Sequence, residues 1–76
     1  MSRLVSTVYG LTGARTDDEL RSIWLKVSRV PDIGAIAFEV DGGSSVMIIK
    51  HKEMVTPDRA AIGAAVRAAG PYELTY

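Results

Sequence analysis

Apolar and polar positions along the chain follow two different periods, and each change of period marks the boundary of a predicted element. Apolar residues at helical spacing follow Thr16 and Thr56. Runs rich in β-branched and aromatic residues are typical of strands and cover 4–9, 33–40, 46–51 and, as a short last strand, 72–76. The predicted order is strand, helix, strand, strand, helix, strand, with Gly10 ending the first strand.

The first predicted helix begins with a capping box. Glu19 follows Thr16 by three residues, so the hydroxyl and the carboxylate can each bond the other residue's backbone amide. Pro31 ends the helix at 29–30, because the residue before a proline avoids the helical conformation. The predicted buried stripe consists of Leu20, Ile23, Trp24, Val27 and Val30.

Turn and cap residues set the remaining boundaries. The segment 41–44, Asp-Gly-Gly-Ser, is typical of a hairpin turn. Thr56 is the predicted cap of the second helix, with Pro57 at its first position. Gly70 is predicted to end that helix in the left-handed conformation. The predicted buried stripe of the second helix consists of Ile62, Ala65, Val66 and Ala69.

This order of elements predicts one domain over 1–76, an α+β ferredoxin-like βαββαβ fold. Its four-stranded antiparallel sheet would carry both helices on one face. Strand alternation then divides the side chains between the faces. We expect the helices to cover Val8, Ile36, Phe38, Val46 and Ile48. The opposite, open face would carry Val5, Tyr9, Ala35, Ala37, Met47 and Ile49.

A mostly apolar open face predicts a partner surface, because this side of an antiparallel sheet normally carries polar residues. The chain has 76 residues and no cysteine, and small domains without disulfides or metals often depend on self-association. We therefore expect a homodimer through the sheet face, or packing on a different protein. The predicted interface residues are Val5, Tyr9, Ala37, Met47 and Ile49.

Charge and hydropathy argue against several classes of function. Nine Lys and Arg residues balance nine Asp and Glu residues, whereas a nucleic-acid binder normally carries a basic excess. No apolar run approaches the roughly 18 residues of a membrane span, and the first residues are too polar for a signal peptide. We expect a cytoplasmic protein that binds neither nucleic acid nor membrane. One histidine and no nucleophile–base pair predict that it is not an enzyme.

The segment 8–16, Val-Tyr-Gly-Leu-Thr-Gly-Ala-Arg-Thr, resembles the metal loop of the heavy-metal-associated domain. That family, found in copper chaperones and metal-pumping ATPases, has a valine strand, then Gly-Met-Thr-Cys-X-X-Cys and a helix. Segments 30–33 and 68–72 echo the family's second strand start and the end of its closing helix. The resemblance spans nearly the whole chain and implies the same ferredoxin-like fold.

The resemblance places the family's metal-binding positions on residues that lack thiols. The methionine falls on Leu11 and the two cysteines fall on Gly13 and Thr16. Two thiolates at this spacing hold Cu(I), whereas glycine has no ligand atom and a threonine hydroxyl is a poor ligand. The segment is thus a degenerate metal loop, and we expect no soft-metal transfer and no cofactor.

Two alternatives remain. The first is a carrier for a harder divalent metal ion such as cobalt, nickel or zinc. It would use His51, the only imidazole, with Met47 on the same strand face and Glu53 nearby. These residues need more ligands from a second subunit, so a solvated histidine is the favoured interpretation. The other alternative is a regulatory domain that binds a small ligand where two sheets meet, as amino-acid-sensing domains of similar topology do.

Overall fold

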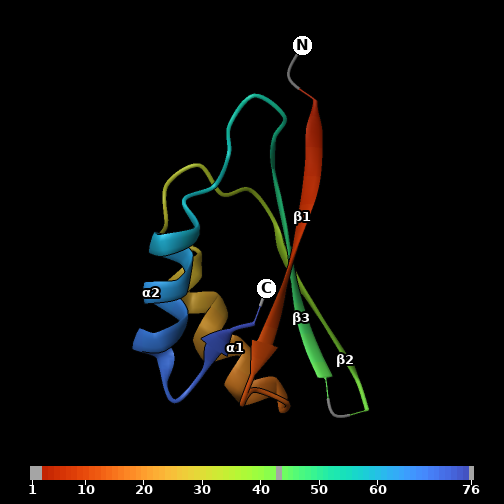
Figure 1. Ribbon diagram of the computed structural model, residues 1–76, viewed down its shortest axis with the longest axis vertical. Helices are drawn as coiled ribbons and strands as arrows, with labels where there is room; N and C mark the ends of the chain where they lie inside the picture. The colour runs from red at the N-terminus through yellow and green to blue at the C-terminus, as the bar shows by residue number, and fades with distance from the viewer. Residues whose placement is uncertain (1–2, 43, 76) are drawn as a thin grey trace.

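The computed structural model describes residues 3–42 and 44–75 and confirms the predicted order of elements. The chain forms an α+β ferredoxin-like fold in which both helices lie on the same side of one sheet (Figure 1). The elements are β1 (Leu4–Thr12), α1 (Asp17–Val27), β2 (Ile36–Asp41), β3 (Ser44–Lys52), α2 (Arg59–Ala69) and β4 (Glu73–Leu74).

The sheet has the strand order β2-β3-β1-β4, and all neighbouring strands are antiparallel. β1 and β3 form the centre and pair from Leu4↔Lys52 to Leu11↔Ser45. β2 and the short β4 are the edge strands. The hairpin between β2 and β3 pairs Asp41 with Ser44, and Gly42 has φ +61°, as a tight turn requires.

β1 continues through Gly10, so the prediction that this glycine ends the strand is wrong. Gly10 is buried and pairs with Val46 on β3. Its carbonyl oxygen also accepts from the backbone N–H of Thr75, 2.8 Å away. Pairing on both sides outweighs the weak strand propensity of glycine, and β1 runs on to Thr12.

β2 begins at Ile36 rather than at Ile33. The backbone N–H of Gly34 donates to the carbonyl oxygen of Lys50, and the N–H of Lys50 donates to the carbonyl oxygen of Ala35, both at 2.8 Å. Two residues therefore oppose one, which is the pattern of a β-bulge. A Cβ on Gly34 would lie 2.8 Å from the Lys50 oxygen, so the close approach requires glycine.

α1 has the predicted capping box. The N–H of Glu19 donates to the Thr16 hydroxyl at 3.2 Å, and the N–H of Thr16 donates to Glu19 Oε1 at 3.1 Å. The helix ends earlier than predicted, at Val27 with Ser28 as the C-cap. Trp24 is 42% exposed, because it lies on the flank of the stripe that buries Ile23 and Val27. The prediction that Trp24 is a core residue is therefore wrong.

α2 begins at Arg59 and its N-cap is Asp58, not Thr56. One carboxylate oxygen of Asp58 accepts from the amides of Ala60 and Ala61, at 3.0 and 3.3 Å, so it satisfies two of the amides that a helix start leaves free. At the other end Gly70 has φ 157° and ψ −161°. The predicted left-handed conformation of Gly70 is therefore wrong.

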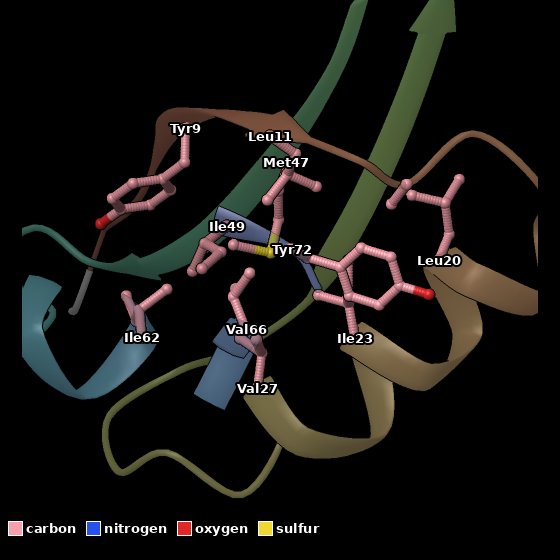
Figure 2. Close-up of a cluster of buried hydrophobic side chains, with 11 residues drawn as sticks. Tyr9, Leu11, Leu20, Ile23, Val27, Met47, Ile49, Ile62, Val66 and Tyr72 are labelled. Atoms are coloured by element: carbon pink, nitrogen blue, oxygen red, sulfur yellow. The ribbon is translucent and has the colours of Figure 1, made fainter. Parts of the chain in front are cut away.

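The core lies between the helices and the covered face of the sheet (Figure 2). The largest side chains with no exposed surface come from α1, β3 and α2. They are Ile23, Met47, Ile49, Ile62, Val27 and Val66.

The two faces of the sheet are exchanged on β1 and β3 relative to the prediction. Met47 pairs with Tyr9 on one side and with Phe38 on the other, so these three side chains share the covered face. Tyr9, Met47 and Ile49 are 4%, 0% and 0% exposed, and Val5 is half-buried on the same face. The prediction that these residues line the open face is wrong.

The open face instead carries Ala37, as predicted, together with Val8, Val46 and Ile48, which were expected under the helices. Alternation shows which residues of one strand share a face, but it does not show which face is covered. Both faces of β1 and β3 carry apolar side chains, so their hydrophobic pattern fits either orientation.

Candidate functional site

The open face of the sheet has an apolar centre. Val8 on β1 pairs with Ile48 on β3, which pairs with Ala37 on β2. Val46 lies two residues along β3 on the same face. Val8 is 47% exposed, and Val46 and Ile48 are half-buried. β1, β3 and β2 therefore present a continuous aliphatic surface to solvent.

Charged residues of opposite sign lie at the two ends of this face. Lys50 and Lys52 follow Ile48 on β3, beside Ser6 and Leu4 at the start of β1. At the other end of the strands, Glu39 pairs with Val46, Asp41 pairs with Ser44, and Glu73 pairs with Thr12. The open face thus consists of a basic end, an apolar centre and an acidic end. We call these the Lys50/Lys52 end and the Glu39/Asp41/Glu73 end.

The sequence reasoning missed these charged residues as part of the surface, although alternation along β3 contained the signal. Lys50 and Lys52 have the same strand parity as Ile48. Once Ile48 is placed on the open face, the two lysines follow it there.

Leu11, Gly13 and Thr16, the positions to which the resemblance assigns metal ligands, each have a structural role. Leu11 is 6% exposed and belongs to the core, and Thr16 caps α1. Gly13 has φ +89°, and a Cβ there would lie 2.7 Å from the carbonyl oxygen of Pro71. Ala14, between them, is 1% exposed and accepts a hydrogen bond from the Ser45 hydroxyl. The loop is therefore packed around glycine and does not present a ligand set.

The fold changes the titration of Glu19 and of its neighbour Tyr72. Hydrogen bonds from the backbone amides of Thr16 and Arg15, and then from the Thr16 hydroxyl, lower the pKa of its carboxyl below the usual 4.5. The hydroxyl of Tyr72 lies 3.5 Å from Glu19 Oε2. Burial, followed by the charge of Glu19, raises the pKa of Tyr72.

We expect Glu19→Gln to lower the free energy of unfolding at neutral pH, with the effect fading in acid. A carboxyl whose pKa is depressed in the folded state stabilises the fold above its unfolded pKa, and this contribution is lost as the pH falls through the folded value. Urea denaturation of both proteins between pH 7 and pH 3 would measure the difference, which should be constant near neutrality and shrink below about pH 4.5. A difference that grows in acid would contradict this assignment.

His51 is buried rather than solvated, so that prediction is wrong. It is 7% exposed. Its Nδ1 lies 2.8 Å from the carbonyl oxygen of Val55 and 3.0 Å from that of Lys52. Because carbonyl oxygens only accept, Nδ1 donates to them, and Nε2 forms a hydrogen bond of 2.7 Å with the Thr7 hydroxyl. Both ring nitrogens have partners within the fold, and the ring ties the turn after β3 to β1.

The structure does not bring the candidate metal ligands His51, Met47 and Glu53 together as a site. Met47 and His51 do share the covered face of β3, but Met47 lies in the core with no exposed surface, and Glu53 is exposed. Within residues 3–42 and 44–75, no three His, Cys, Asp or Glu side chains gather as they would to hold a metal ion. A metal would also have to displace Thr7 from His51.

Comparison with known proteins adds no relatives, since no family model, curated protein or solved structure matches the chain. In the described part of the chain, neither helix is long and apolar enough to cross a membrane.

Proposed function

We propose that this chain is a small non-enzymatic binding module, similar to a heavy-metal-associated domain with a degenerate metal loop, that self-associates through the open face of its sheet. The observation that supports the proposal is the charge pattern of that face. An apolar centre of Val8, Ala37, Val46 and Ile48 lies between the Lys50/Lys52 end and the Glu39/Asp41/Glu73 end.

The charge pattern selects one way of stacking two copies. A two-fold axis parallel to the strands would place lysines over lysines and carboxylates over carboxylates, and like charges in an interface are unfavourable. An axis across the strands reverses one sheet over the other. The Lys50/Lys52 end of each copy then lies over the Glu39/Asp41/Glu73 end of its partner, and the apolar centres meet. This interface is isologous, as in most dimers.

The dimer should be weak. A standard stable interface buries about 800 Å² on each partner, which is about one sixth of the 4946 Å² surface of this chain. The open face is small for such an interface, because one of the four strands, β4, has only two residues. We therefore expect a dissociation constant that is roughly micromolar, so the oligomeric state must be followed across a concentration series.

A charge-swap experiment tests the proposal. One variant carries Lys50→Glu and Lys52→Glu, and the other carries Glu39→Lys and Asp41→Lys. Each variant alone would place like charges over one another, and we expect its dimer to dissociate at least about tenfold more readily than the parent, as 1.4 kcal/mol would produce. In an equimolar mixture the opposite charges face one another again, and heterodimers should form. Sedimentation velocity at several concentrations measures all three samples.

The uncharged control is Ile48→Ser, which removes aliphatic surface from the centre of the face and should weaken the dimer without any charge change. A parent protein that stays monomeric at several hundred micromolar would reject self-association. A dimer that survives both charge variants and Ile48→Ser would place its interface on another surface.

A further inference from the structure

The outer edge of β2 presents free backbone groups. β2 is the last strand on its side of the sheet. The backbone N–H of Lys50 on β3 donates to the carbonyl oxygen of Ala35. In an antiparallel pair, hydrogen-bonded positions alternate along each strand. Ala37, Glu39 and Asp41 are therefore the β2 residues that bond to β3. The N–H and C=O groups of the alternate residues, Ile36, Phe38 and Val40, therefore point away from the sheet. Such an edge can pair with another extended chain.

An open groove of about 400 Å³ lies along this edge, between β2 and α1. Its apolar lining comes from Leu20 and Trp24 on α1 and from Ile36 and Phe38 on β2. Trp24 is 42% exposed, although it belongs to a helix that buries Ile23 and Val27 completely. A strand added to β2 would place alternate side chains in this groove, since directly opposed residues of paired strands share a face.

The edge is protected against pairing with a second copy of itself. Antiparallel pairing of two β2 strands would bring the Glu39 and Asp41 side chains of both copies onto one face within a few ångströms of each other. Four carboxylates gathered on adjacent strands repel one another, and opposed like charges destabilise a sheet. The same two carboxylates would attract a strand that carries cations at the opposed positions.

We infer that the β2 edge binds an extended peptide segment of a partner protein, in which apolar residues alternate with Lys or Arg, as a fifth strand of the sheet. The apolar side chains lie opposite Ile36, Phe38 and Val40 and enter the groove beside Trp24. The basic side chains lie opposite Ala37, Glu39 and Asp41, on the other face. This mode is β-strand addition, in which backbone hydrogen bonds give affinity and alternate side chains give specificity. The peptide pairs with the edge of the sheet, whereas the proposed dimer uses its open face, but both would use the carboxylates of Glu39 and Asp41.

Synthetic peptides test the inference. The probe is an acetylated and amidated eight-residue peptide of alternating valine and lysine, and its counterpart has glutamate in place of lysine. Fluorescence of Trp24, the only tryptophan of the chain, and backbone amide shifts report binding. We expect the lysine peptide to bind at least tenfold more tightly than the glutamate peptide, with the largest amide shifts at Ile36, Phe38 and Val40.

Val40→Pro is the decisive variant, because it removes an outward N–H while leaving the bonds from β2 to β3 in place, and proline is accepted at such edge positions. It should weaken binding of the lysine peptide at least tenfold, whereas Val40→Ala, which keeps the N–H, should change it less than threefold. Val8→Ser, two strands away on the open face, should also leave it unchanged. Binding that is insensitive to Val40→Pro would show attraction by charge alone and would overturn the inference. No binding at millimolar peptide, or equal binding of both peptides, would also overturn it.

Discussion

Replacing Ile49 by alanine should lower the free energy of unfolding by about 2–5 kcal/mol, the usual cost of truncating a fully buried aliphatic side chain. A chain of 76 residues has a total stability of only roughly 4–11 kcal/mol, so this one change removes a large part of it. Ile49 has no exposed surface and lies in the core with Met47 and Ile62. Its neighbour Ile48 points to the open face and is half-buried.

Ile48→Ala is the matched control, because it removes the same atoms from the adjacent residue on the opposite face. We expect it to cost about 1 kcal/mol or less. Urea denaturation followed by circular dichroism would measure both variants. The protein should be dilute, because a dimer would add to the apparent stability of the parent. If Ile48→Ala proved more costly than Ile49→Ala, the helices would have to cover the face that we describe as open.

Replacing Gly13 by alanine should destabilise the fold by more than the roughly 1–3 kcal/mol usual for backbone strain at one residue. Two effects act at this position. Its φ of +89° is one that other residues adopt only with strain. In addition, the new Cβ would lie 2.7 Å from the Pro71 carbonyl oxygen and 3.2 Å from Cδ1 of Tyr72. Because the first of these atoms belongs to the backbone, the segment before β4 would have to move.

Gly42→Ala separates the two effects. Gly42 also has a positive φ, +61°, but a Cβ there meets nothing within 4 Å. We expect it to show the backbone strain alone, about 1 kcal/mol. Thermal or urea denaturation of the two variants gives the contribution of the contact with Pro71 as the difference between them. Equal losses at Gly13 and Gly42 would mean that the loop yields to the added methyl group.

The geometry at Gly13 also bears on the resemblance to heavy-metal-associated domains. A cysteine at Gly13 would meet the same strain as alanine, and a cysteine at Thr16 would remove the hydroxyl that caps α1, at a cost of about 1 kcal/mol. Introducing two cysteines at these positions would therefore destabilise the fold. Gly13 is part of how the loop packs against Pro71 and Tyr72.

Local signals predicted the elements well because their causes are local. The capping box of Thr16 and Glu19 joins residues three apart, and the 41–44 turn needs only the conformational freedom of glycine. Errors at the element ends came from longer-range partners. β1 passes Gly10, which lies opposite Val46 on β3 and accepts a hydrogen bond from the backbone N–H of Thr75, just after β4.

The prediction of which sheet face the helices cover was wrong for β1 and β3, although one signal in the sequence indicated the correct face. The two-residue turn pairs Asp41 with Ser44, and counting back along both strands pairs Phe38 with Met47. Directly opposed residues share a face, so accepting Phe38 as a core residue places Met47 and Ile49 in the core as well. The hydrophobic pattern of β3 alone carries no such information.

The sequence by itself determined the order of elements, the capping of the first helix, the hairpin turn and the absence of thiol ligands, since each depends on residue types a few positions apart. Only the tertiary structure decided that His51 lies beneath the surface with Thr7 and Val55, and that Trp24 borders a groove beside β2. These facts depend on segments far apart in the chain coming together.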